Sequence, residues 1–258
     1  MIQTNKKISF IFLFFFTIFC IYSQNPKLII QNGHSGSFIG DISPDGKHLV
    51  TGGVDGKILL WDLKSGRHFA PINNSMFSIS DLKWDEDNQH IYSSDNIGNF
   101  CRWDIKTRSV EKQIFNADSS IVKIIPIPKK DLIFTLGLDS SLRIYDRKLN
   151  RKVYKRMKDT YGVCASYLSL NGNEAIIVGC RDSTQKIFSI PNLEELNSTA
   201  LGDLLLDVCF NSDFSRVAYT FSSTVNLLTF PSGNPIKTYK IPSNFYSPTG
   251  GFSFLSTL

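Results

Sequence analysis

The feature that most constrains the fold is a sequence unit that recurs along the chain. Each copy ends in a short apolar segment closed by a bulky residue and a turn. These closing residues, called anchors below, are separated by 42, 42, 43 and 40 residues: Trp61, Trp103, Tyr145, Phe188 and Leu228. A fixed period of about 40 residues with several short apolar segments per copy is typical of repeating all-β architectures.

The physical consequence of this period is a ring of small sheets. A second bulky apolar residue lies 18 to 20 residues before each anchor, so the whole unit repeats: Ile42, Trp84, Ile127, Leu168 and Phe210. Each unit therefore predicts four short strands. One four-stranded antiparallel sheet cannot bury both of its faces, but sheets arranged around an axis can bury them against each other. The sequence predicts an all-β propeller of five four-stranded blades.

The first unit, GHSGSFIGDISPDGKHLVTGGVDGKILLWD (33–62), resembles the WD40 repeat family. The second unit matches the family pattern less closely and the other three are degenerate, so the resemblance covers about residues 27–258. It implies that His34, Thr51, Asp55 and Trp61 form a structural hydrogen-bonded tetrad rather than a catalytic site. A buried indole N–H and a buried imidazole both need such partners. The second unit has Ile97 in place of the turn aspartate.

The two ends of the repeat predict partial blades. Residues 27–31 (KLIIQ) read as an isolated outer strand, and residues 250–258 (GGFSFLSTL) as the inner strand of a sixth unit. The ring is therefore expected to be open, or the chain to be truncated relative to a longer protein. A compact five-bladed ring is the competing arrangement.

The N-terminus predicts export. Lys6 and Lys7 precede a 15-residue apolar run at 8–22, and Ser23 offers a small residue for cleavage. This order is typical of a signal peptide, and the run is shorter than the roughly 20 residues of a transmembrane helix. We expect a signal peptide at 1–23, a propeller at 24–258, cleavage between Ser23 and Gln24, a secreted or periplasmic location and no stable membrane insertion afterwards. An uncleaved N-terminal anchor is the alternative.

The charge is modest, at +5 for the whole chain, which does not favour nucleic acid as a partner. One segment at 147–158 is strongly basic: Arg147, Lys148, Arg151, Lys152, Lys155, Arg156 and Lys158. It follows the third anchor, so it predicts the outermost strand of blade three with its turns. Lysine on such an edge prevents pairing with other sheets, and the alternative is a surface for an anionic partner.

The cysteines and histidines indicate no metal site. Cys101, Cys164, Cys180 and Cys209 lie in apolar segments, which favours buried thiols, although export would also permit a disulfide. The histidines do not show metal-ligand spacing, and no cofactor motif or nucleophile motif is present.

These observations predict a non-catalytic scaffold that presents loops to a protein partner, without a cofactor. The first alternative is an N-terminal sensor or partner module of a longer or split effector protein. The second is a propeller hydrolase or lyase, which would need charged side chains from several blades to converge at the central channel.

Overall fold

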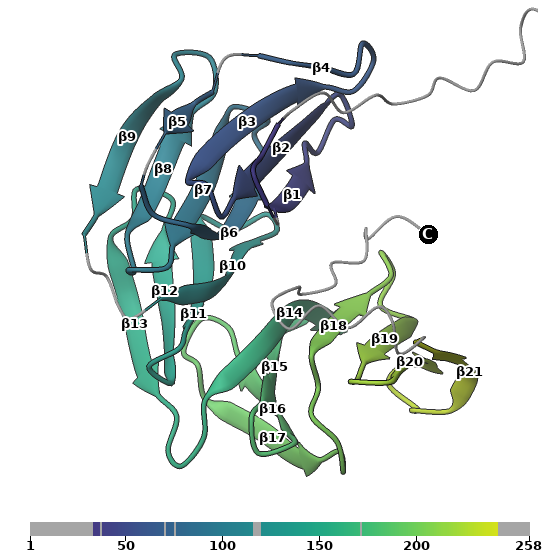
Figure 1. Cartoon of the computed structure of the whole chain (residues 1–258). Helices are drawn as coiled ribbons and strands as arrows, with labels where there is room; N and C mark the ends of the chain where they lie inside the picture. The colour runs from purple at the N-terminus through teal and green to yellow at the C-terminus, as the bar shows by residue number, and fades with distance from the viewer. Residues whose placement is uncertain are drawn as a thin grey trace, which may run out of the picture. The chain divides into compact units, whose positions relative to one another are not determined.

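The computed structural model describes residues 33–36, 38–69, 71–74, 76–115, 120–170 and 172–241. Every helix or strand assigned in these residues is a β-strand, and the strands form five antiparallel sheets that follow one another in a ring (Figure 1). The predicted all-β propeller with five blades is confirmed. The predicted signal peptide at 1–23, the outer strand at 27–31 and the partial sixth blade from about 250 lie outside the described residues.

Each sheet is built from strands that are consecutive in the chain. Blade one contains β1 (Phe38–Ile42), β2 (His48–Gly53), β3 (Lys57–Asp62), β4 (Arg67–His68) and β5 (Asn73–Asn74). Blade two contains β6 (Ile79–Trp84), β7 (His90–Asp95), β8 (Phe100–Asp104) and β9 (Ser109–Ile114). Blade three contains β10 (Ile121–Ile127), β11 (Leu132–Gly137), β12 (Ser141–Asp146) and β13 (Arg151–Arg156). Blade four contains β14 (Gly162–Leu170), β15 (Asn173–Cys180), β16 (Thr184–Ser189) and β17 (Glu195–Ala200). Blade five contains β18 (Asp207–Phe210), β19 (Arg216–Thr220), β20 (Thr224–Thr229) and β21 (Pro235–Lys240).

The apolar cores lie between neighbouring blades. Leu60 of blade one packs in one cluster with Leu82 and Trp103 of blade two. Further clusters join blades two and three, blades three and four, and blades four and five. In the cluster that joins blades two and three, the ring centroid of the anchor Tyr145 lies 5.4 Å from that of Phe100. From blade one to blade five, each pair of successive blades thus buries a shared apolar face.

Burial falls from the second strand of each blade to the outermost strand. The second strands, such as β7 and β11, are almost wholly buried, whereas β17 and β21 are exposed along their whole length. The five anchors all lie on the third strand: Trp61, Trp103, Tyr145, Phe188 and Leu228. The sequence repeat therefore reports the same position in every sheet.

The fourth strand of blade one is divided into two pieces. β4 pairs with the end of β3 at Trp61 and Asp62, and β5 pairs with its start at Lys57 and Ile58. Backbone bonds from Phe69 to Leu60 and from Ile72 to Ile58, both 2.8 Å, continue the pairing at the inner ends of both pieces. β4 and β5 together take the place of one outer strand.

The thiols in the described residues are free, with Cys101, Cys164 and Cys180 buried and Cys209 partly buried. Burial raises the pKa of the Cys101 and Cys164 thiols to about 12. They behave as small apolar residues, as expected from their positions. In the part of the chain that the structure describes, no helix has the length and apolar character to cross a membrane.

Candidate functional site

The innermost strands β1, β6, β10, β14 and β18 line one central cavity of about 640 Å³. These strands pack against each other in chain order. The cavity reaches the turns after β1 and β18, where Pro44 and Ser212 are exposed. Charged side chains from four blades line it: Asp41, Lys83, Lys123 and Asp207. We call these four residues and the buried Asp81 beside them the channel charges.

Asp41 joins the first two blades at this cavity. Its Oδ1 lies 3.0 Å from the Nζ of Lys83, and its Oδ2 accepts the backbone N–H of Trp84 at 2.8 Å. The indole Nε1 of Trp84 donates to the backbone carbonyl of Asp41 at 3.0 Å. One residue of β1 therefore holds three groups of β6.

The other channel charges link blades two, three and five. The buried Asp81 of β6 accepts the backbone N–H of Ile124 on β10, with its Oδ2 2.6 Å from that nitrogen. Lys123 of β10 places its Nζ 3.9 Å from Oδ1 of Asp207 on β18. This last pair connects blades three and five, which are not neighbours in the chain order.

The electrostatics of the channel reflect burial and mutual attraction. Burial raises the pKa of Asp81 and of Asp207, and the nearby lysines oppose the rise. Burial alone would lower the pKa of Lys83, but the carboxylates of Asp41 and Asp81 outweigh it and raise that pKa. The ammonium group of Lys83 is thus held charged among carboxyl groups.

Charged groups from different blades therefore do converge on the channel, as the hydrolase or lyase alternative required. A carboxyl group with a raised pKa, such as that of Asp207, is a common feature of catalytic sites. Here, however, Lys83 and Lys123 each face an aspartate, at 3.0 and 3.9 Å. Neutralised pairs of this kind brace neighbouring strands, and structural ion pairs perturb pKa values as well.

The sequence analysis did not identify the channel charges, although they stand at equivalent positions of the repeat. They occupy two positions that recur every 42 residues on the innermost strands. The first position holds Ile39, Asp81, Lys123, Ala165 and Asp207, and the second holds Asp41, Lys83, Ile125, Tyr167 and Cys209. Comparing the units at these positions reveals charges in otherwise apolar strands, which is the signal that would have found them.

The four residues of the predicted tetrad lie in one hydrogen-bonded chain within blade one. Nε1 of Trp61 donates to Oγ1 of Thr51 at 2.8 Å. Nε2 of His34 lies 2.8 Å from the same oxygen, and its Nδ1 lies 3.0 Å from Oδ1 of Asp55. Because Thr51 already accepts the indole proton, its hydroxyl donates to Nε2, and Nδ1 carries the proton given to Asp55. That this network is structural rather than catalytic stays a prediction.

Blade one makes room for this imidazole with a glycine. A Cβ on Gly53 would lie 2.4 Å from both Nδ1 of His34 and Oδ1 of Asp55. In blade three the corresponding space is used differently, because the buried guanidinium of Arg143 bonds to Ser141 and lies 3.3 Å from Oδ2 of Asp139. An arginine from the third strand there takes the place of a histidine from the preceding loop.

The basic segment at 147–158 lies on and beside the outermost strand β13. Four of its seven side chains have partners. Arg147 Nη1 lies 3.2 Å from Oδ1 of the buried Asp85, Lys152 pairs with Asp146 at 3.0 Å, Lys155 donates to a backbone carbonyl, and Arg151 stacks on a tyrosine ring. The others, Lys148, Arg156 and Lys158, are exposed and form no ion pair with any described residue. The surface open to an anionic partner is thus smaller than the sequence suggested.

Two groups in the described residues have metal-ligand character and share His90 in one cluster: Asp85 with Asp87 and His90, and His90 with Asp104 and Glu111. Its groups already bond to protein atoms. Asp85 accepts the hydroxyl of Tyr92 at 2.7 Å, and Nδ1 of His90 lies 2.5 Å from Oδ2 of Asp87. These contacts join turn and strand within blade two, so the cluster is a structural network.

Comparison with known proteins supports the repeat assignment. Residues 25–62 match a family model described as "WD domain, G-beta repeat". The chain is 22% identical over 165 residues to pre-mRNA-splicing factor cwf17 of Schizosaccharomyces pombe, covering 62% of this chain and 47% of that protein. It is 25% identical over 215 residues to eukaryotic translation initiation factor 3 subunit I of Bombyx mori, covering 75% and 65%. It is 22% identical over 157 residues to the U3 snoRNP-associated protein-like EMB2271 of Arabidopsis thaliana, covering 58% and 33%. The chain thus matches less than two thirds of the length of each relative.

The tetrad makes the stability of the folded protein fall at acid pH, because it lowers the pKa of Asp55. Burial would raise its pKa, but bonds from His34 and from the N–H groups of Ser35 and Lys57 outweigh it and lower the pKa to about 2. Because this lies below the value of about 3.9 in an unfolded chain, the stabilisation is full above that value and is lost as the pH falls towards about 2. The melting temperature of Asp55→Asn should therefore lie below wild type at about pH 5 and approach it at about pH 2. A constant difference across this range would contradict the assignment.

The ion pair of Arg147 gives a second prediction. Arg147→Ala leaves the buried Asp85 without its cation, so the free energy of unfolding should fall by about 1–3 kcal/mol, allowing for the partial exposure of the arginine. Lys148→Ala, the adjacent exposed residue, should change it by less than about 0.5 kcal/mol. Urea unfolding followed by tryptophan fluorescence measures both. Equal effects of the two changes would show that Arg147 belongs to the exposed basic surface after all.

Proposed function

Because this chain belongs to the WD40 repeat family, we propose that it is a non-catalytic scaffold that binds a protein partner at the mouth of its central channel. The observation that carries the proposal is the central cavity, which the innermost strands of all five blades line and which reaches the turns after β1 and β18. A site assembled from five blades presents a rigid, composite surface. Scaffolds of this type position loops without moving them.

The paired channel charges support a protein partner. A surface with two carboxyl groups and two ammonium groups offers both signs within one cavity. Such a surface complements the mixed charges of a protein better than the uniform charge of nucleic acid. The pairing of Lys83 with Asp41 also supports the non-catalytic role, since neither group stands free to exchange a proton with a substrate.

The names of the relatives agree with this role. One is called a subunit of a translation initiation factor and another is called snoRNP-associated. These names describe proteins that work in assemblies. We extend to this chain only the expectation of a protein partner, without its identity.

We further propose that the protein is exported and acts outside the cytoplasm. The support is the sequence of residues 1–23, with its two lysines, its apolar run and Ser23 at the end. The basic surface of Lys148, Arg156 and Lys158 is a secondary docking point in this proposal, suited to an acidic patch on the partner.

Partner capture with the full chain tests the scaffold. An arginine introduced by Ser212→Arg, in the turn after β18 at the channel mouth, should abolish capture because it blocks and recharges the rim. The matched control is Ser232→Arg, an exposed serine in the turn after β20 of the same blade. Affinity purification from the source organism with quantitative mass spectrometry compares both with wild type.

Two results would count against the scaffold proposal. Retention of the same proteins by Ser212→Arg and wild type would place the binding surface elsewhere. Failure of wild type to enrich any protein over cells that lack the tagged chain, with wild type and both variants showing the same melting temperature, would contradict the scaffold role itself.

Export predicts a defined mature N-terminus. Cells expressing the full chain should yield protein that starts at Gln24, found outside the cytoplasm. Intact-mass spectrometry of the fractionated protein checks this directly. A chain that retains residues 1–23 in the membrane fraction would support the uncleaved anchor, and an uncleaved cytoplasmic chain would refute export.

A further inference from the structure

The two ends of blades one to three differ in the side chains that they expose. At one end lie the starts of the first strands, the connections that lead to them and the turns after the second strands. Two large apolar side chains from each blade are exposed at this end, and we call the six the apolar patch: Phe38, Val54, Met76, Ile97, Phe115 and Leu138. The turns at the other end of these blades, all of them described, follow the first and third strands and expose no large apolar side chain.

Hydrogen bonds hold this end of the three blades together. The hydroxyl of Ser78, just before β6, donates to the backbone carbonyl of Val54 at 3.0 Å and so joins blade two to the turn of blade one. The hydroxyl of Ser80 on β6 donates to the backbone carbonyl of Ile121 at 2.7 Å, where β10 of blade three begins. The six side chains of the apolar patch therefore stand on neighbouring turns that are fixed to each other.

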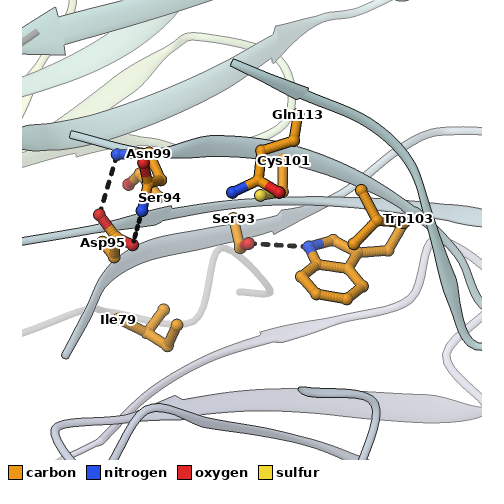
Figure 2. Close-up of a pocket in the computed structure, with 9 residues that line it drawn as sticks. Ile79, Ser93, Ser94, Asp95, Asn99, Cys101, Trp103 and Gln113 are labelled. Carbon is orange, nitrogen blue, oxygen red and sulfur yellow. Dashed lines mark hydrogen bonds between the residues drawn. The ribbon is translucent and has the colours of Figure 1, made fainter. Parts of the chain in front are cut away.

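Blade two shows how its sequence makes this end apolar. Its turn places Ile97, which is 39% exposed, at the repeat position that holds aspartate in blades one, three and four. The N–H groups of the turn bond instead to Asp95, whose Oδ1 accepts those of Ile97 and Asn99. Figure 2 shows the bonded pairs Asp95 with Asn99 and Ser93 with Trp103, which line a cavity of about 220 Å³ within the blade. With the carboxylate turned into the blade, an apolar side chain occupies the outer position of the turn.

The apolar patch is large for the surface of a single chain. Met76 and Phe115 are its most exposed members, at 93% and 71%. With about 200 Å² for each fully exposed residue, the exposed fractions of the six residues give about 700 Å². The largest apolar patch of a typical monomer covers about 300–600 Å². A stable protein interface buries about 800 Å² on each partner, so the apolar patch supplies most of one side of such an interface.

We propose that two copies of this chain pair through the apolar patch and form a symmetric dimer. Interfaces between identical chains are more apolar than other protein interfaces, and two-fold symmetry brings the same residues to both sides. A second copy is thus an equally apolar partner, and their contact leaves no charge of the partner buried without a counterion.

The dimer leaves the central cavity accessible. The cavity reaches the turns after β1 and β18, which lie at the opposite end of the blades from the apolar patch. A dimer of this kind presents its two cavity mouths on its outer surfaces. The inference therefore does not depend on the proposed scaffold function, and either can fail without the other.

Sedimentation velocity tests the dimer on protein expressed as the full chain and purified as the cells process it. Wild type should sediment as a dimer at about 50 μM. Met76→Asp combined with Phe115→Asp should weaken the dimer at least about hundredfold, because it places carboxylates from both copies in an apolar interface. The matched control combines Leu196→Asp with Ile236→Asp, at exposed apolar residues of the outermost strands β17 and β21, and should leave the dimer unchanged.

A charge swap separates loss of pairing from loss of folding. Met76→Lys combined with Phe115→Lys should also be monomeric by itself. A mixture of the lysine and aspartate variants should restore a dimer, because opposite charges then meet across the interface. Misfolded variants cannot restore it, so this result would support pairing of patch with patch.

Four results would overturn the proposal. A wild-type dimer that persists in the aspartate variant would place the interface elsewhere, and a mixture that stays monomeric would exclude pairing of patch with patch. A wild type that is monomeric at about 50 μM would show that a second copy does not cover the patch. Flotation of that monomer with phosphatidylcholine vesicles, lost in the aspartate variant, would assign the patch to a lipid surface instead.

Discussion

Apolar packing between neighbouring sheets is the interaction on which the rest of this structure depends. A blade with four short strands has two faces and no helix to cover either, so it is stable only when adjacent blades close over it. The clusters joining successive blades supply that cover, with buried residues such as Leu82 and Tyr145. The innermost strands then meet around one cavity, and the outermost strands are left exposed. The channel charges therefore occupy a surface that exists only because the blades pack in a ring.

The fold could be predicted because its information is repeated. Five anchors at nearly equal intervals indicate five equivalent sheets, even where Leu228 has replaced tryptophan. The partners of His34 could also be named, because the best-preserved unit contains the full set. The channel charges could not be found in this way, since their pairing depends on which blades face each other across the ring. Lys123 and Asp207 are 84 residues apart, and nothing local to either residue indicates the other.

The blades solve one local problem with different chemistry. At the end of the second strand, polar side chains must accept hydrogen bonds from the N–H groups of a turn. The indole or phenol of the anchor residue lies near these side chains. Blade one uses a histidine with Asp55, and blade three uses Arg143 with Asp139. In blade two the carboxylate is that of Asp95, two positions earlier in the repeat than Asp55, and a cavity lies beside it. Degenerate repeats thus keep the geometry of the turn while their side chains diverge, so that new pockets arise inside blades as well as between them.

The contact between Lys123 and Asp207 affects how the blades of the ring are held together. Apolar packing joins each blade only to its neighbours, whereas this ion pair connects blades three and five directly, across blade four. Widening the channel at blade four would pull the two charges apart. Their side chains are 25% and 14% exposed, so dissolved ions reach them and weaken their attraction as the salt concentration rises. The sensitivity of this contact to ionic strength is therefore a property of the assembled ring that no single blade possesses.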